Sequence, residues 1–342
     1  MRRAIAIAAL CTIPRLAMAQ SRPSGTLVVA NMNDNTAMIL DATSGSVRAT
    51  LPTGNGPHEV AISRDGRWAL VSNYGARGQP GNTLTVINIA ARTVDRTITL
   101  EGYQRPHGMT FLPGDTVVAV TCETRGAVLL VDFRSGAVLR TLPTSGRAPH
   151  IVASTAAGDR LYTGNIGSGT VAIIDPASGD SAQVVKVARQ PEGVTVAADG
   201  RSVWAGSNVD SVVMVVDPHR GAVVDTLRGF GLAYRIAITP DSRIAVITDP
   251  VRDEVRLYDV PTRTLRRTLK IAPDSLVPTA EVAGSASPEG VTTSRDSRFA
   301  FVTLQGRNRV ITIDLATNEI INTAVIGTWS DGIGYSPIPA PD

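Results

Sequence analysis

The chain has 342 residues, of which 43% are hydrophobic and 18% are charged, with 33 Lys and Arg against 30 Asp and Glu. A high apolar fraction with nearly balanced charge excludes a mainly disordered chain. Aromatic residues make up only 4% of the sequence, which argues against a stacking surface for single-stranded nucleic acid.

Residues 1–19 have the features of a signal peptide. Two arginines precede a short apolar stretch, and an Ala-Met-Ala motif ends at Ala19. We expect cleavage after Ala19 and a periplasmic or secreted mature protein. The apolar stretch is too short to span a membrane, and no later stretch is long enough, so we expect no membrane span.

The charge of the chain depends on this segment. Three of the 33 basic residues, and none of the 30 acidic residues, lie in it. Cleavage therefore leaves a formally neutral mature chain, so the basic pI of about 9.1 does not indicate a basic surface. Cys122 is then the one remaining cysteine, which excludes an intramolecular disulfide.

A repeat of about 42 residues organises the rest of the chain. Six copies align without gaps, and a partial seventh ends the chain: 57–73, 106–122, 149–165, 191–207, 233–249, 288–304 and 330–337. A β-branched run follows each full copy, and one more precedes the first copy. The runs end in Asp or Asn, which we interpret as turn formers: Asp41, Asn88, Asp132, Asp175, Asp217, Asp259 and Asp314.

Four short strands per repeat predict an all-β, seven-bladed β-propeller. The first unit lacks its opening strand, whereas the last segment has an opening strand and nothing after it. We therefore expect the C-terminal strand to complete the N-terminal blade, which removes an open sheet edge. The prediction is a single propeller domain over residues 20–342.

Two recurring patterns carry a family resemblance. They are P-x-G-V…D-G/S-R…V-T/S-N and V-x-V-I-D-x-x-S-G-x-V, repeated across residues 25–337. The chain resembles the bacterial YVTN-repeat seven-bladed β-propellers, many of which are exported. The literal tetrapeptide is absent, and residues 70–73 are its nearest match. The resemblance implies the fold, but members of this family differ in function.

One repeat position varies in its chemistry. Each copy of the repeat usually begins with proline, and its second residue opens the innermost strand. These second residues should therefore ring one mouth of the central channel. They are Asp331, His58, His107, His150, Glu192, Tyr234 and Glu289. Three of the four histidines occupy this position, in consecutive blades. The histidines suit a divalent metal such as Zn²⁺ or Cu²⁺. An organic or anionic ligand and a purely structural polar ring are the alternatives.

Further residues are expected at the same mouth. Arg105, Arg147 and Glu123, with Tyr234 and Asp331, are candidates for orienting a substrate at the rim. Cys122 replaces an asparagine at the end of a second strand, as either a soft metal ligand or a small buried residue. Two insertions, 75–82 and 271–287, are expected to form loops on this side.

Three functions follow from these residues. The first is a binding or scaffold protein that holds a metal or small molecule, or presents its rim to a partner protein. The second is a metal-dependent enzyme of the lactonase, lyase or oxidase type, with Glu192 or Glu289 as acid/base. The third, suggested by the resemblance, is nucleic-acid binding, against which the neutral charge counts. We expect a monomer.

Overall fold

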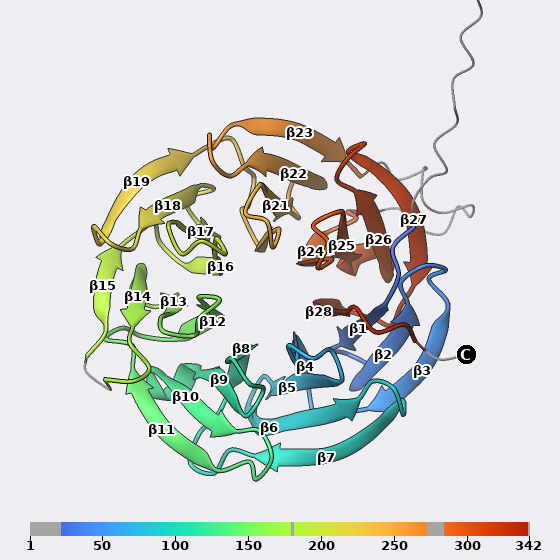
Figure 1. The fold of residues 1–342 in the computed structure, drawn as a ribbon, viewed down its shortest axis with the longest axis horizontal. Coiled ribbons are helices and arrows are strands. Elements are labelled where there is room, and N and C mark those ends of the chain that lie inside the picture. Colours follow the sequence, from blue (N-terminus) through green and yellow to red (C-terminus); the bar gives the residue numbers. More distant parts are fainter. Residues whose placement is uncertain (1–21, 179–180, 272–283, 341–342) are drawn as a thin grey trace, which may run out of the picture.

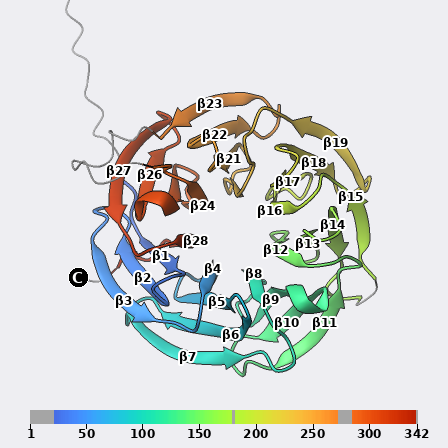
Figure 2. The same cartoon turned by 180° about the vertical axis from the view of Figure 1, so that it is seen from behind.

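The computed structural model describes residues 22–178, 181–271 and 284–340, so the predicted signal peptide lies outside the described residues. Seven four-stranded antiparallel sheets form a ring around a central channel (Figure 1). The view from behind shows the same ring from its other face (Figure 2). The prediction of a seven-bladed β-propeller is confirmed.

Each blade is written here from its innermost to its outermost strand. Blade 1 contains β28 (Ser330–Ser336), β1 (Thr26–Asn31), β2 (Thr36–Asp41) and β3 (Val47–Pro52). Blade 2 contains β4 (Pro57–Ile62), β5 (Trp68–Ala76), β6 (Gln79–Asn88) and β7 (Thr93–Thr99). Blade 3 contains β8 (Pro106–Phe111), β9 (Val117–Cys122), β10 (Ala127–Asp132) and β11 (Val138–Pro143). Blade 4 contains β12 (Pro149–Ser154), β13 (Leu161–Asn165), β14 (Thr170–Ile174) and β15 (Gln183–Lys186).

The remaining blades follow the same order. Blade 5 contains β16 (Pro191–Val196), β17 (Val203–Ser207), β18 (Val213–Asp217) and β19 (Ala222–Leu227). Blade 6 contains β20 (Ile236–Ile238), β21 (Ile244–Asp249), β22 (Glu254–Asp259) and β23 (Leu265–Lys270). Blade 7 contains β24 (Pro288–Thr293), β25 (Phe299–Leu304), β26 (Arg309–Asp314) and β27 (Glu319–Val325). Two short 3₁₀ segments, η1 (Glu123–Arg125) and η2 (Gln305–Arg307), follow β9 and β25.

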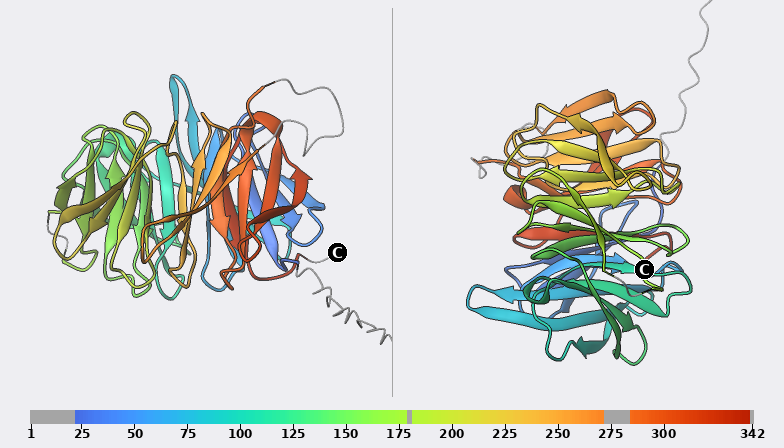
Figure 3. Two further views of the ribbon diagram at one scale, coloured as in Figure 1. Left: turned by 90° about the horizontal axis from the view of Figure 1, so that it is seen from above. Right: turned by 90° about the vertical axis from the view of Figure 1, so that its left-hand side faces the viewer.

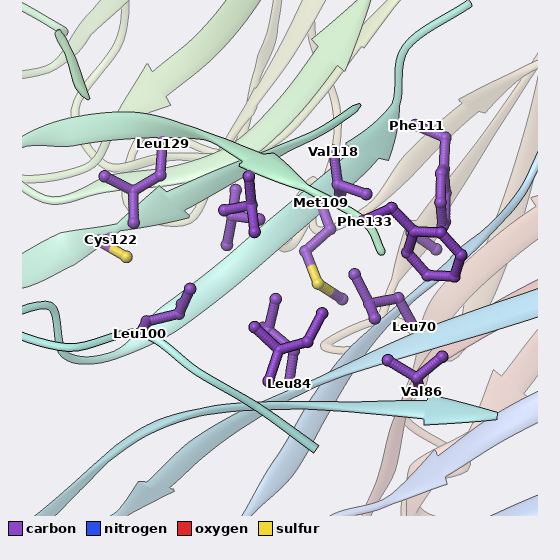
Figure 4. Close-up of a cluster of buried hydrophobic side chains, with 14 residues drawn as sticks. Leu70, Leu84, Val86, Leu100, Met109, Phe111, Val118, Cys122, Leu129 and Phe133 are labelled. Carbon is purple, nitrogen blue, oxygen red and sulfur yellow. The ribbon is translucent and has the colours of Figure 1, made fainter. Parts of the chain in front are cut away.

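Burial explains why these sequences form strands in these places. Middle strands such as β9 and β10 pack on both faces against neighbouring blades, so they are runs of buried apolar residues. The outermost strand β11 alternates between exposed and covered residues, as expected where one face meets solvent. The core lies between blades; one cluster joins blades 2 and 3 around Leu84, Met109 and Leu129 (Figure 4).

The seven predicted turn formers are confirmed by their hydrogen bonds. Each side chain accepts a bond from a backbone amide two or three residues further on, between the third and fourth strands. For example, Asp132 accepts from the amide of Ser135 at 2.7 Å. These bonds satisfy turn amides that no strand can pair with, so the aspartates serve the fold rather than the channel.

The ring closes as the sequence predicts. β28 pairs antiparallel with β1, with Thr26 opposite Ser336 and Leu27 opposite Tyr335. The Tyr335 hydroxyl also donates to the carbonyl of Ser24 at 2.9 Å. In the part of the chain that the structure describes, no helix is long and apolar enough to cross a membrane.

The first predicted insertion is a hairpin rather than a loop. β5 and β6 remain paired beyond Asn73, to Ala76 opposite Gln79. Gly75 and Gly78 both have positive φ angles, which allow the strand to kink and the tip to turn tightly. The hairpin rises from one face of the ring (Figure 3). Most of the second insertion, residues 272–283, lies outside the described residues.

Glycines let the innermost strands crowd around the channel. In four blades the third residue of the innermost strand is glycine: Gly108, Gly193, Gly290 and Gly332. A Cβ at Gly332 would lie 2.2 Å from the carbonyl oxygen of His58 and 2.6 Å from the Cα of Glu59. The backbone of the next blade therefore occupies the space that a side chain would need.

Gly332→Ala should destabilise the protein, because the clash is with backbone that cannot move independently. We expect a loss of about 1–3 kcal/mol or more in the free energy of unfolding, measured by urea denaturation. Gly114→Ala is the control, because nothing lies within 4 Å of its Cβ position and only the positive φ angle is penalised, at roughly 1 kcal/mol. Equal losses in the two variants would contradict the crowding argument.

Candidate functional site

The structure places the three predicted histidines side by side at the channel mouth. Each is the second residue of an innermost strand, on β4, β8 and β12. The ring centroids of His58 and His107 are 4.3 Å apart, and those of His107 and His150 are 3.4 Å apart. The repeat therefore brings three imidazoles from consecutive blades into one stack.

His150 is held between two carboxylates. Its Nδ1 lies 2.5 Å from Glu123 Oε1 and its Nε2 lies 2.6 Å from Glu192 Oε1. Burial alone would lower the pKa of His150, but the charge of Glu192 and the two hydrogen bonds outweigh it and raise the pKa to about 9. His150 is therefore an imidazolium at neutral pH and donates from both nitrogens.

His107 has the opposite character. Its side chain is fully buried, and neither ring nitrogen meets the geometry of a hydrogen bond, although the backbone of His150 lies near enough to oppose the fall in its pKa. Burial, followed by the nearby charges of His150, His58 and Arg235, holds the pKa of His107 well below its ordinary value. His107 is therefore a neutral imidazole whose lone pair is unused, an arrangement that is rare for a buried polar group.

A buried arginine crosses the channel. Arg235 lies just before β20, with Nη1 2.5 Å from Glu192 Oε1 and Nη2 2.5 Å from Glu59 Oε1. Nη2 also lies 3.5 Å from Asp331 Oδ2. Arg235 follows the predicted rim residue Tyr234 in the sequence, and the structure buries it among these carboxylates.

Glu59 is a site residue that the sequence analysis did not single out. Its Oε1 lies 3.8 Å from His58 Nδ1 and 4.0 Å from His107 Nδ1. Glu59 and Arg235 both occupy the third position of the repeat, where four other blades have glycine. Opposite charges at a position that is otherwise mostly glycine are the signal that would have revealed this pair.

His58 lies at the open end of the stack. Its Nδ1 is 3.1 Å from Asp331 Oδ2, but the angles do not make a hydrogen bond and this nitrogen is unpartnered. Tyr74 on β5, also missed by the sequence analysis, places its ring against both His58 and His107, with centroids 5.3 and 5.4 Å away. Its hydroxyl donates to Glu123 Oε2 at 2.5 Å.

The channel mouth contains more acids than bases. Arg235 and protonated His150 face five carboxylates: Glu59, Glu123, Glu192, Glu289 and Asp331. Burial raises the pKa of Glu59 in spite of Arg235. Burial and the charge of Asp331 raise the pKa of Glu289 to about 8. An added cation near these acids would favour their ionised forms.

Two groups of side chains have the spacing of a metal site. They are His58, Glu59 and His107, and His107, Glu123 and His150; within each group the ligand atoms lie within 4.8 Å of one another. Imidazole and carboxylate ligands suit Zn²⁺ and Cu²⁺. Both groups depend on His107.

The other predicted residues divide into two sets. Tyr234 joins the site, since its hydroxyl donates to Asp331 Oδ2 at 3.3 Å. Glu289 accepts from Gln305 Nε2 at 2.6 Å. Arg147 is exposed and donates to the carbonyl of Gly167. Cys122 packs in the apolar cluster between blades 2 and 3 (Figure 4), and burial raises the pKa of its thiol to about 12.

Arg105 lies beside the histidines rather than among them. Its guanidinium stacks 4.7 Å from the ring centroid of Tyr74. One of its nitrogens also lies 3.5 Å from the carbonyl of Ala76, at the hairpin tip. The structure thus joins Arg105 to the channel mouth through Tyr74.

The raised pKa of Glu289 should make stability depend on pH. Its pKa is 4.5 in the unfolded chain and about 8 in the fold, so the fold retains a proton that the unfolded chain releases, and stability falls as pH rises from 4.5 through 8. Glu289→Gln should remove on the order of 2–4 kcal/mol of that fall, measured by urea denaturation between pH 5 and 9. Glu319→Gln, at the exposed start of β27, is the control and should keep the wild-type dependence of the free energy of unfolding on pH. If Glu289→Gln also kept that dependence, Glu289 would ionise normally.

Solved structures resemble this chain in fold. Hydrazine synthase from Kuenenia stuttgartiensis superposes with a TM-score of 0.69 at 17% identity, covering 89% of this chain and 99% of that one. A functionally unknown protein from Desulfotomaculum acetoxidans DSM 771 gives a TM-score of 0.72 at 12% identity, covering 93% and 100%. At these identities the likeness shows the propeller fold alone. A search of curated proteins found no match.

A family comparison is more specific. The model of the YNCE-like beta-propeller family matches residues 127–330, more than half of the chain. This match agrees with the resemblance to YVTN-repeat propellers that the repeat patterns carry. The chain belongs to the YNCE-like beta-propeller family.

Proposed function

We propose that this protein is an exported β-propeller that binds a divalent metal ion, Zn²⁺ or Cu²⁺, at the mouth of its central channel. The observation that carries the proposal is His107, a fully buried imidazole with two unpartnered nitrogens. Leaving a buried polar group without a partner is unfavourable by roughly 1–3 kcal/mol. A metal bound to the neutral ring would recover this free energy.

The group formed by His58, Glu59 and His107 is the better metal site of the two. His58 Nδ1 and the ring nitrogens of His107 have no hydrogen-bond partner, so each ring can offer one nitrogen lone pair as a ligand. In the other group His150 donates from both nitrogens to carboxylates. A metal there would have to displace a proton that those carboxylates stabilise.

Local charge supports the same assignment. Burial raises the pKa values of Glu59 and Glu289, and the charge of Asp331 raises both further. A divalent cation beside Glu59 would lower the free energy of its ionised form. Metal binding should therefore release protons.

Glu289 favours a second candidate function, a metal-dependent enzyme of the lactonase, lyase or oxidase type. With a pKa of about 8, its carboxyl retains a proton near neutral pH and can donate it to a substrate. Glu192 is unsuited to that role. Although burial opposes it, His150 and Arg235 hold the pKa of Glu192 well below its ordinary range.

Metal analysis of the mature protein tests the proposal. We expect about one equivalent of Zn²⁺ or Cu²⁺ per chain after loading and dialysis, and loss of most of it in His107→Ala. His219→Ala is the matched control, because His219 lies in an exposed turn after β18. Urea denaturation of both variants shows whether they fold.

The outcomes separate the candidates. A wild-type protein that takes up neither metal, or a folded His107→Ala variant that binds as well as wild type, would refute the metal site. The enzyme would be selected if metal-loaded protein turns over a lactone or a lyase substrate. The Glu289→Gln variant should then lose this turnover while it retains the metal. Metal binding without turnover would select the binding protein.

A further inference from the structure

A second site lies beside the histidines, in a cleft of about 600 Å³ between blades 1, 2 and 3. Its walls include Asn33, Asn35, Asn55, Tyr74, Arg77 and Arg105. The volume is within the range of small-ligand pockets. No acidic residue lines it, so the cleft is positively charged, unlike the acidic channel next to it.

The two arginines have no carboxylate partner. In the described ranges, neither Arg77 nor Arg105 forms an ion pair; the Arg105 side chain donates to the Ala76 carbonyl at 3.5 Å and lies against Tyr74. Arg77 is exposed at the tip of the β5–β6 hairpin. Their guanidinium groups therefore have free N–H donors, in the geometry that pairs with carboxylate or phosphate.

The hairpin is what creates the cleft. Beyond Asn73 the two strands extend further than the repeat requires and carry Tyr74 and Arg77 above the ring. The amide of Gly75 donates to the carbonyl of Asn55 at 2.9 Å, which fixes the hairpin against the connection between blades 1 and 2. Tyr74 lines the cleft and its ring also contacts His58 and His107. Its side chain therefore lies between the cleft and the histidines.

The asparagines indicate which other groups the ligand carries. Asn33 and Asn55 are exposed, and their amides offer donors and acceptors to hydroxyl groups. We propose that this cleft binds a small polyhydroxylated anion, with its carboxylate or phosphate on Arg77 and Arg105 and its hydroxyls on the asparagines. The inference goes beyond the metal site and does not depend on it.

Calorimetric titration with three probes that share one sugar framework tests this inference. Glucuronate carries a carboxylate, glucose 6-phosphate carries a phosphate, and glucose is neutral. Metal-free mature protein at low salt should bind at least one charged probe at least tenfold more tightly than glucose. The tighter of the two identifies the anionic group.

Variants locate the binding. Arg77→Gln should weaken binding of the charged probe about tenfold. The double variant with Arg105→Gln should bind it more weakly still. Arg147→Gln, an exposed arginine outside the cleft walls, is the matched control and should bind like wild type. Because Arg77 is at an exposed hairpin tip, its substitution should leave folding intact.

Three results would overturn the inference. The first is that neither charged probe binds more tightly than glucose. The second is that Arg147→Gln loses as much affinity for the charged probe as Arg77→Gln does. The third is that binding requires added metal and is unchanged in Arg77→Gln. The last would place the anion on the metal instead of in the cleft. Conversely, anion binding by a protein that takes up no metal would support the cleft while refuting the metal site.

Discussion

The close approach of seven innermost strands around one narrow channel is the constraint on which the rest of the structure depends. At Gly108, Gly193, Gly290 and Gly332, the neighbouring strand fills the place of a Cβ. Side chains at the second and third positions of each innermost strand must therefore share one buried space. In this protein that space contains imidazoles, carboxylates and a guanidinium rather than apolar groups, so packing and electrostatics cannot be separated there.

Buried charge is stable only when it is paired. Arg235 pairs with Glu59 and Glu192, and Glu192 pairs in turn with His150. These pairs leave Glu289 with a raised pKa and His107 without a partner. Buried polar atoms without partners, which here also include His58 Nδ1, Arg235 Nε and Asp331 Oδ1, are expected at a functional site more than in a purely structural ring.

Repeats explain how much of this the sequence could predict. The fold followed from periodicity, because each blade repeats the same strand runs and turn aspartates, and the ring of second-position residues followed from the same alignment. Glu59 was missed because its repeat position is mostly glycine and because its partner Arg235 is 176 residues away in the sequence. Tyr74 was missed because it begins a hairpin that has no counterpart in other blades. Neither contact is encoded in a local pattern, so only the closed ring reveals it.

Equivalent positions in the repeat do not imply equivalent chemistry. His107 and His150 occupy the same place on adjacent blades, yet one is neutral and the other protonated. The difference comes from their neighbours. Glu123, the first residue of η1, and Glu192 of blade 5 both reach His150. By contrast, His107 Nδ1 is 4.0 Å from Glu59, whose carboxylate is paired with Arg235. The three histidines share one position of the repeat. The difference in charge between His107 and His150 comes from the residues that differ between the blades.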